Sequence, residues 1–296
     1  MEKINIIVPN DVLDLINLFK SYDKELYIVG GAVRDYLIGK QPIDYDFCTN
    51  ALPNELIKIL DGYKLDTFSL NLGNIKVIIN VNIYAITTLR KEQGMINGRY
   101  PKQIEFVNDI NIDLQRRDFT INAMALGYND GFYLIDPLNG IEDIKNKYIR
   151  FIGDPEVRIK EDPIRILRAI KFMLRLEFNI SLMDLAAIFE HASLVKELDN
   201  NFKYKELLEI LSNKNIDKHL MIYDDFYHEA FPELKSFFDK RSIINDENVY
   251  YIYFFSLEKD IALNQLLYLP ITKAEKKALR KVINNYNSYE EYLKSK

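Results

Sequence analysis

The sequence predicts an α+β fold in which a mixed half is followed by an all-helical half. Up to about residue 150, short β-rich runs alternate with helical stretches and with Gly, Pro and Asn turn signals. From Pro155 onward, apolar residues recur at helical spacing and only short loops intervene. We therefore expect the two halves to meet near Gly153 and Pro155.

Length and composition are those of an ordinary globular protein. The chain has 296 residues, enough for two domains, and its 48% hydrophobic and 28% charged residues exclude collagen-like, low-complexity and largely disordered classes. No apolar run is long enough to span a membrane, and acidic residues interrupt positions 1–20, where a signal peptide needs an apolar core. The single Cys48 and 3 isolated histidines exclude a structural zinc site of usual spacing. We expect a cytoplasmic protein without membrane contact.

Charge alone does not identify a partner. The net charge of −5 argues against nucleic acid, because Lys and Arg contacts to phosphates dominate the affinity of nucleic-acid-binding proteins. Two basic runs, 158–175 and 273–281, oppose this conclusion. Each is typical of a solvated helix face, and each would also serve as a nucleic-acid contact if other features supported one.

A strand, a glycine turn and a helix are predicted in succession. Leu26–Val29 form a short apolar run, Gly30 and Gly31 follow without Cβ atoms, and Ala32–Ile38 have helical spacing. Such a turn lets the backbone approach a triphosphate closely, with free N–H groups at the helix start and the cationic Arg34 in the first turn. An ordinary structural turn explains the same residues.

Two carboxylates alternate with apolar residues in the next segment. Ile43, Tyr45 and Phe47 are expected on one face of a strand, with Asp44 and Asp46 on the other face. Like charges held that close are unfavourable unless a cation lies between them, and carboxylate oxygens suit Mg²⁺ that bridges to substrate phosphates. An exposed edge strand is the alternative, but the nearby glycine turn favours the metal site.

A basic pair opens the third segment. Arg116, Arg117 and Asp118 are expected at the entrance of a helix that Thr120 helps to start. Arg can hold a phosphate with two hydrogen bonds, and Asp118 or Asn122 can bond a ribose hydroxyl or the end of a primer. An ion pair and a helix cap explain the same residues equally well.

A further helix is expected to begin at Pro163, with Asp162 as its N-cap and with Arg165 and Arg168 on or near one face. Cytosine and adenine both present an amine donor beside a ring-nitrogen acceptor, whereas uracil and guanine present the reverse order. One carboxylate with one guanidinium can read that difference. An exposed helix with an i,i+3 ion pair is the alternative.

Together these segments resemble the class II tRNA nucleotidyltransferases, which comprise the CCA-adding enzymes and the related CC-adding, A-adding and poly(A) polymerases. The resemblance rests on VGGAVRDYLIG…PIDYDFCTNALP, RRDFTINAMAL and EDPIRILRAIKF, in the family's order, and is dense from residue 25 to about 177. It implies a polymerase-β-like nucleotidyltransferase head over 1–152 and a helical neck with base recognition over 153–212. A shortened helical body and tail over 213–296 would bind tRNA.

The resemblance also implies residue roles. Asp44 and Asp46 would be catalytic and would bind two Mg²⁺ ions. The incoming nucleotide would contact, in the head, Gly31, Arg34, Arg117 and Asp118 and, in the neck, Asp162, Arg165, Arg168 and Lys171. Asp162 and Arg165 would read the edge of the base. Lys171 stands where the family commonly has Arg, and this difference weakens a bidentate contact.

Other features depart from the family's pattern. The segment 90–101 resembles the family's flexible loop, with Glu92 and Arg99 at plausible places, but it holds fewer acids than usual. The neck lacks the family's Ser-x-Glu-Arg signature, and the chain is shorter than expected for a full body and tail. The basic run 273–281 is either a shortened grip on tRNA or the solvated face of a last helix.

The expected function is addition or repair of the 3′-terminal CCA of tRNA from CTP and ATP, without a nucleic-acid template and with release of pyrophosphate. A CC-adding, A-adding or poly(A)-adding relative remains open, because all share these motifs and the 90–101 loop is altered. A non-catalytic RNA-binding protein is the alternative from another class, and the retained Asp44, Asp46, Arg34 and Arg117 oppose it. A homodimer also remains open.

Overall fold

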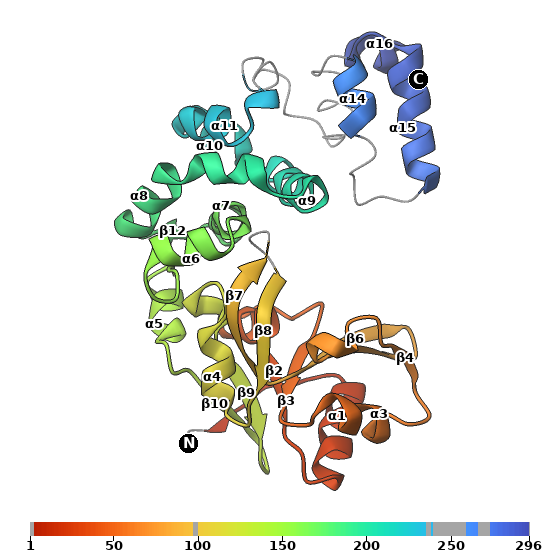
Figure 1. The fold of residues 1–296 in the computed structure, drawn as a ribbon, viewed down its shortest axis with the longest axis vertical. Coiled ribbons are helices and arrows are strands. Elements are labelled where there is room, and N and C mark those ends of the chain that lie inside the picture. Colours follow the sequence, from red (N-terminus) through yellow and green to blue (C-terminus); the bar gives the residue numbers. More distant parts are fainter. Residues whose placement is uncertain (1–2, 97–99, 235–237, 239–258, 266–272, 296) are drawn as a thin grey trace. The chain divides into compact units, whose positions relative to one another are not determined.

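The computed structural model divides into two compact units, which we call the head unit and the helical unit. The head unit comprises residues 1–96 and 100–154, and the helical unit comprises 97–99 and 155–296. The structure describes all residues except 1–2, 97–99, 235–237, 239–258, 266–272 and 296 (Figure 1). In these described parts, no helix is long and apolar enough to cross a membrane.

An eight-stranded mixed sheet lies at the centre of the head unit (Figure 1). Its strands are β1 (Lys3–Ile4), β2 (Leu26–Val29), β3 (Asp46–Thr49), β4 (Lys64–Asp66), β5 (Asn74–Ile79), β6 (Asn82–Thr88), β9 (Ala125–Tyr128) and β10 (Phe132–Ile135). The strand order is β1-β10-β9-β2-β3-β6-β5-β4. Strand β3 therefore lies between β2, to which it is antiparallel, and β6, to which it is parallel.

Short helices accompany the sheet. They are α1 (Asn10–Ser21), α2 (Gly31–Leu37), α3 (Pro53–Ile59), α4 (Ile110–Gln115) and α5 (Gly140–Lys145), with 3₁₀ turns η1 (Leu70–Leu72) and η2 (Thr120–Asn122) and a short strand β11 (Tyr148–Ile149). Helix α1 forms because its apolar residues recur at helical spacing. Its Val12, Leu15, Ile16 and Phe19 are all buried in the core of the unit.

The predicted strand, glycine turn and helix are confirmed as β2, Gly30 and α2. The strand predicted around the two aspartates is only partly correct. Tyr45 and Phe47 are buried as expected, but Ile43 is 88% exposed, because the chain enters the sheet only at Asp46. The side-chain alternation of a strand applies only to residues that are already paired in the sheet.

The helix predicted after Thr120 is wrong. Arg116 is the C-cap of α4, so the basic pair follows a helix instead of preceding one. Helix α4 begins upstream because Asp109 caps it, accepting a hydrogen bond from the backbone N–H of Asn111. After the single turn η2, pairing with β2 and β10 holds Ala125–Tyr128 in an extended strand.

Most of the segment expected to be a flexible loop is a hairpin. Strand β7 (Arg90–Ile96) pairs antiparallel with β8 (Tyr100–Phe106). Arg99, one of the two residues expected to be functional there, lies outside the described residues. Glu92 lies on β7 and is paired with Arg90 and Arg116.

The helical unit contains the helices predicted from Pro155 onward. Its elements are α6 (Pro155–Glu161), α7 (Ile164–Leu176), β12 (Asn179–Ile180), α8 (Leu182–Glu190), η3 (Ala192–Glu197), α9 (Asn200–Leu211), α10 (Ile216–Ile222), α11 (Asp224–Ala230), η4 (Pro232–Leu234), α14 (Lys259–Gln265), α15 (Lys273–Asn285) and α16 (Tyr289–Lys294). Helix α7 begins one residue later than expected, with Pro163 as its N-cap. Helix α15 buries Leu279 and Ile283 and exposes Lys277 and Lys281, so both interpretations of the basic run 273–281 stay open.

A buried histidine is expected to make the helical unit sensitive to acid. His219 is 5% exposed, and burial lowers its pKa to about 4. The unfolded chain keeps the ordinary pKa of 6.5, so the folded state binds fewer protons between these values. Stability is therefore full above pH 6.5 and falls as the pH decreases from 6.5 to 4, by at most about 3 kcal/mol.

Urea unfolding at about pH 7.5 and about pH 5 measures this loss. The control is His219→Gln, which cannot titrate in this range and should lose less stability between the two pH values. Equal losses in the wild type and the variant would contradict the assignment.

Candidate active site

Two carboxylates lie at the start of β3, beside the glycine turn. Asp44 and Asp46 are both exposed, and Asp46 is in register with Val29, the last residue of β2. Although solvent reaches part of Asp46, partial removal of its carboxylate from water raises its pKa. The charge of Arg117 lowers this pKa, the charge of Asp44 raises it, and the net shift is upward. A divalent cation between the two carboxylates would relieve their repulsion, so the pair fits a metal site.

The glycine turn lies directly against two guanidinium groups. Gly30 has a φ of +69°, which residues with a side chain rarely adopt. A Cβ atom at Gly30 would be 3.3 Å from Nη1 of Arg117, and one at Gly31 would be 3.5 Å from Nη2 of Arg34. The missing side chains therefore leave bare backbone next to two fixed cations. That is the environment in which a phosphate chain can bind.

Arg34 is held in place before any ligand binds. Its side chain is 3% exposed, and its Nη2 lies 2.7 Å from Oδ1 of Asp35. Its Nη1 donates to Oδ1 of Asn122 over 2.7 Å, and the Asn122 amide in turn donates to Asp118 over 3.2 Å. The structure thus joins Arg34 and Asp118, two residues predicted for the nucleotide site, through Asn122.

Asp113 organises the basic pair. It is fully buried, lies 2.9 Å from Nε of Arg116 and 3.3 Å from Nη2 of Arg117, and accepts a hydrogen bond from the backbone N–H of Arg90. Burial raises the pKa of Asp113, but the charges of Arg116 and Arg117 and the hydrogen bonds outweigh it, so the pKa lies below its ordinary value. Asp113 is thus a buried anion that fixes both guanidinium groups.

The sequence analysis missed Asp113, although a signal for it exists. It precedes Arg116 and Arg117 by three and four positions, the spacing at which side chains meet on one face of a helix. That spacing becomes informative only if α4 is placed before the basic pair. Our prediction placed the helix after the pair, and the ion pairs therefore went unnoticed.

A pocket of about 370 Å³ opens beside Asp46. Its wall is formed by Val29, Asp46, Phe47, Cys48, Ser69, Leu72, Asn74, Ala85, Thr87, Arg90, Arg116 and Arg117. Arg90 is fixed at this wall, since its guanidinium donates to the Leu72 carbonyl and lies 2.7 Å from the Glu92 carboxylate. The pocket is therefore a structured, cationic cavity next to the candidate metal ligands.

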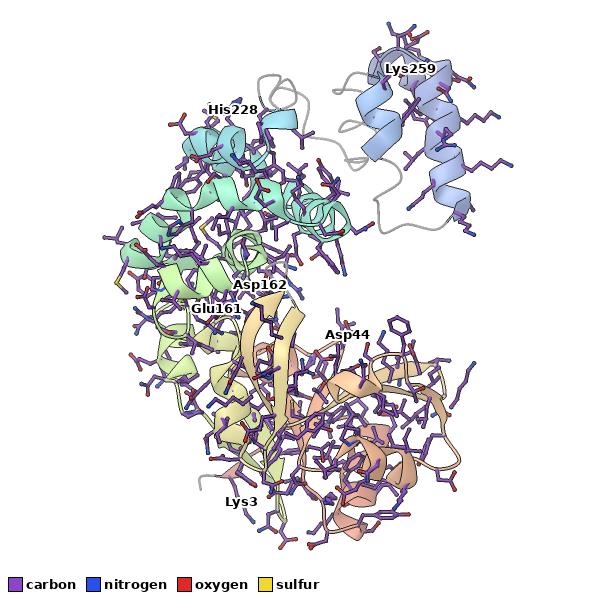
Figure 2. The ribbon with its side chains drawn as sticks, viewed as in Figure 1. Lys3, Asp44, Glu161, Asp162, His228 and Lys259 are labelled. Carbon is purple, nitrogen blue, oxygen red and sulfur yellow. The ribbon has the colours of Figure 1, made fainter. Side chains whose placement is uncertain are left out.

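The predicted base-reading residues lie in the helical unit, whereas Asp44 belongs to the head unit (Figure 2). Asp162 accepts a hydrogen bond from the backbone N–H of Ile164 at the start of α7. Arg165 is 5% exposed, and its Nη1 contacts the Arg158 carbonyl at 2.6 Å and Glu161 at 3.2 Å. Its Nε and Nη2 have no hydrogen-bond partner among the described residues, so these donors are open to a ligand.

The remaining two neck residues have other contacts. The Arg168 guanidinium lies 5.7 Å from the centre of the Phe172 ring. The Lys171 ammonium lies 2.5 Å from Glu206 and 3.3 Å from Glu209. The structure thus gives Lys171 two carboxylate partners on α9, and its predicted contact with the nucleotide would compete with them.

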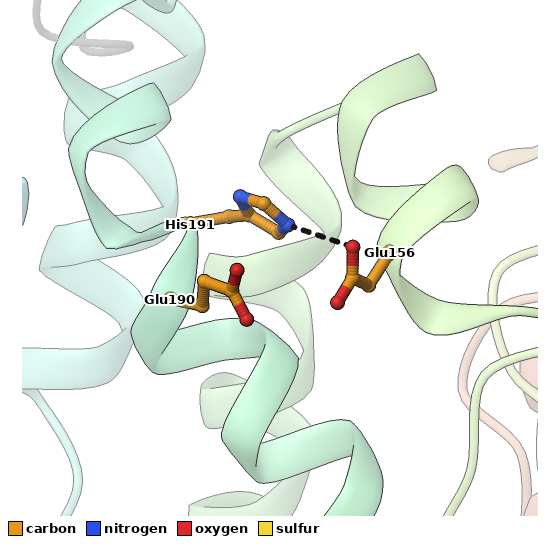
Figure 3. A group of neighbouring side chains, drawn as sticks. All are labelled: Glu156, Glu190 and His191. Carbon is orange, nitrogen blue, oxygen red and sulfur yellow. Dashed lines mark ion pairs between the residues drawn. The ribbon is translucent and has the colours of Figure 1, made fainter.

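A separate cluster of potential metal ligands occurs in the helical unit (Figure 3). Glu156, Glu190 and His191 bring one ligand atom each within 4.8 Å of one another. Nε2 of His191 is 3.6 Å from Glu156, whose carboxylate also pairs with Lys160 at 3.1 Å. These contacts describe an ion-pair cluster at the end of α8, where positive charge is favourable. The cluster is not part of the candidate active site.

Replacing Gly30 by alanine is expected to lower the free energy of unfolding by about 1–3 kcal/mol and to weaken nucleotide binding. The positive φ causes the strain, and the new Cβ atom would press on Arg117. Gly39→Ala is the matched control, since Gly39 also has a positive φ but a Cβ atom there would meet nothing within 4 Å. Urea unfolding and the KM for CTP measure the two effects. A KM that rises equally in both variants would contradict the role given to the turn.

Comparison with known proteins agrees with this geometry. Residues 26–150 match the family described as the poly A polymerase head domain. The chain is 40% identical over 174 residues to a CCA-adding enzyme of Lactobacillus helveticus, covering 59% of this chain and 43% of the relative. It is 34% identical over 262 residues to one of Staphylococcus epidermidis, covering 86% and 63%. The chain thus spans less than two thirds of the length of either relative.

Solved structures extend the similarity over most of the chain. The Bacillus stearothermophilus CCA-adding enzyme in complex with CTP has a TM-score of 0.71 at 25% identity, over 94% of this chain and 68% of the other. A tRNA nucleotidyltransferase complexed with a primer tRNA and an incoming ATP analog has a TM-score of 0.70 at 26% identity, over 95% and 87%. The predicted α+β fold, with a nucleotidyltransferase head and a helical second half, is confirmed. The sequence and the fold of this chain are thus similar to those of the class II tRNA nucleotidyltransferases, the family of the CCA-adding enzymes.

Proposed function

We propose that this protein adds or repairs the 3′-terminal CCA of tRNA, using CTP and ATP and releasing pyrophosphate. The observation that carries the proposal is the juxtaposition of Asp44 and Asp46 with a glycine turn backed by the guanidinium groups of Arg34 and Arg117. This arrangement suits a metal-bound nucleoside triphosphate. The names of the relatives and the ligands in the similar solved structures support tRNA, CTP and ATP as substrates.

Divalent cations, two Mg²⁺ ions in our proposal, would be held by Asp44 and Asp46. When bound, such ions supply Lewis-acid stabilisation of the charge that develops on the triphosphate. Arg34 and Arg117 bind the phosphate oxygens, and their ion pairs with Asp35 and with the buried Asp113 hold them in position beforehand. This preorganisation reduces the cost of orienting charged groups during the reaction.

The reaction is a direct displacement. The 3′-hydroxyl oxygen of the RNA attacks the α-phosphorus of the nucleotide, and the bond from that phosphorus to the bridging oxygen breaks. The hydroxyl proton passes to water, and pyrophosphate leaves. No protein side chain becomes bonded to the nucleotide, since the residues at the site only bind and orient the reactants.

Base selection is assigned to Asp162 and Arg165, with Arg168 and Lys171 nearby on α7. The remaining donors of Arg165 would bond to the ring-nitrogen acceptor of a base, and the carboxylate of Asp162 would accept from its exocyclic amine. This pattern matches cytosine and adenine but not uracil. Rearrangement of the hairpin segment 90–101 would change the preference from C to A. A tRNA substrate makes the cytoplasm the site of action.

Asp162→Ala is expected to relax discrimination against UTP by about 10- to 100-fold, the value of one hydrogen bond to a charged group. Competition between CTP and UTP for incorporation into one tRNA transcript measures this ratio. The matched control is Asp154→Ala, which removes an acid just before α6. A lower rate with unchanged selectivity would make Asp162 structural instead.

Product sequencing tests the proposal as a whole. Transcripts ending at the discriminator base, at C and at CC are incubated with Mg²⁺ and with CTP, ATP or both. Complete CCA with both nucleotides is the expected result. Products that stop at CC would indicate a CC-adding enzyme. Addition of A only to the CC transcript would indicate an A-adding enzyme, and long A tails would indicate a poly(A) polymerase. No incorporation would favour a non-catalytic RNA-binding protein.

A further inference from the structure

The pocket beside Asp46 extends away from the glycine turn. Asp46 is in register with Val29 of β2 on one side and with Ala85 of β6 on the other. The glycine turn follows Val29, and Arg117 beside that turn lines the same pocket. From there the pocket continues past Ala85 to Thr87 on β6 and Asn74 on β5. The pocket thus holds both a guanidinium group next to the glycine turn and polar side chains of β5 and β6.

The stereochemistry of phosphoryl transfer assigns the glycine-turn side and the β5–β6 side of Asp46 to different substrates. In phosphoryl transfer, the attacking oxygen and the leaving oxygen lie roughly in line on opposite sides of the phosphorus. With the triphosphate on the glycine turn and on Arg34 and Arg117, the attacking hydroxyl must arrive from the opposite side of Asp46. That side is the part of the pocket formed by β6 and β5.

This part of the pocket carries a matched donor and acceptor. Asn74 and Thr87 face each other in the register of β5 and β6, and the Asn74 amide donates to Oγ1 of Thr87 over 2.8 Å. That bond leaves the Asn74 carbonyl oxygen as an acceptor and the Thr87 O–H as a donor. Neither has another hydrogen-bond partner among the described residues. A ribose 2′-hydroxyl, which both donates and accepts, fits this pair.

We infer that Asn74 and Thr87 bind the 2′-hydroxyl of the last nucleotide of the RNA primer and thereby select RNA over DNA ends. The inference rests on the proposed function, because it places the primer opposite the triphosphate. Arg90, fixed at the wall by the Leu72 carbonyl and Glu92, adds positive charge to the same pocket, where the last phosphate of the primer would lie.

The test compares two tRNA substrates that end in CC and differ only in the last nucleotide, which is either ribocytidine or 2′-deoxycytidine with its 3′-hydroxyl intact. We expect the wild type to prefer the ribose end by about tenfold in kcat/KM. Thr87→Val, which keeps the side-chain shape, and Asn74→Ala should each move this ratio toward one. The control Asn82→Ala removes an amide from the same strand β6 outside the pocket and should keep the wild-type preference.

A second readout separates the inference from the proposed function. The affinity for the two RNAs without nucleotide is measured by fluorescence anisotropy in the same variants. Transfer without a preference for the ribose end, or a preference that survives in both Thr87→Val and Asn74→Ala, would overturn the inference and leave the proposed function intact. A preference in binding that depends on these residues, without any transfer, would support the pocket and overturn the proposed function. A raised KM for CTP in Thr87→Val together with an unchanged ribose preference would mean structural damage and would also overturn the inference.

Discussion

Replacing Asp46 by asparagine is expected to lower the rate of nucleotide incorporation by at least about 10³-fold while leaving tRNA affinity near that of the wild type. The carboxylate oxygens of Asp44 and Asp46 are the proposed ligands of the divalent cations. An amide keeps the size of the side chain but removes the charge that such cations need. Because the loss concerns the transition state and not RNA binding, kcat should fall and the Kd for tRNA should not change.

Radiolabelled CTP incorporation and filter binding of tRNA measure the two quantities. Asp44→Asn should behave like Asp46→Asn, since both carboxylates are exposed and the charge of Asp44 acts on Asp46. The matched control is Asp61→Asn, which removes an exposed carboxylate elsewhere in the head unit. Turnover near the wild-type rate in either variant would contradict the assignment of the metal ligands.

Asp113→Asn is expected to lower the free energy of unfolding of the head unit by about 3 kcal/mol or more. Removing one partner of a buried ion pair leaves the other charge less compensated, and here Arg116 and Arg117 would both lose the Asp113 carboxylate, although Arg116 keeps its ion pair with Glu92. The KM for CTP should also rise, since Arg117 would no longer be held beside the glycine turn.

Urea unfolding near pH 7 measures the full effect. The pKa of Asp113 lies below its ordinary value of 3.8, so its contribution to stability is present above that pH and is lost as the pH falls below it. Asp61→Asn again serves as the exposed control and should change stability by less than about 0.5 kcal/mol. A similarly small change for Asp113→Asn would contradict the role of Asp113.

Local sequence signals were sufficient to predict the glycine turn and the burial pattern around the two aspartates. A short apolar run, two residues without side chains and helical spacing predicted β2, Gly30 and α2, because each depends on residues next to one another in the chain. The burial of Tyr45 and Phe47, which alternate with the two aspartates, was predicted in the same way.

Features that depend on distant partners were not predicted. The strand Ala125–Tyr128 contains residues with helical spacing, but pairing with β2 and β10 outweighs that preference. Ile43 is exposed because the ladder with β2 and β6 begins only at Asp46. The role of Asp113 required knowledge of where α4 ends. In each case the deciding partner lies far along the chain or beyond an element boundary that local signals do not fix.

Counting pyrophosphate released per tRNA tests the central claim most directly, because it joins primer, nucleotide and metal in one reaction. With Mg²⁺ and CTP, a transcript ending at the discriminator base should release one pyrophosphate for each missing C, and ATP should add one more. A transcript that already ends in CCA should release none. The claim that this chain completes the CCA end of tRNA would be contradicted by any of three results. Pyrophosphate release could continue without limit, it could be the same for every primer end, or it could be absent with all transcripts.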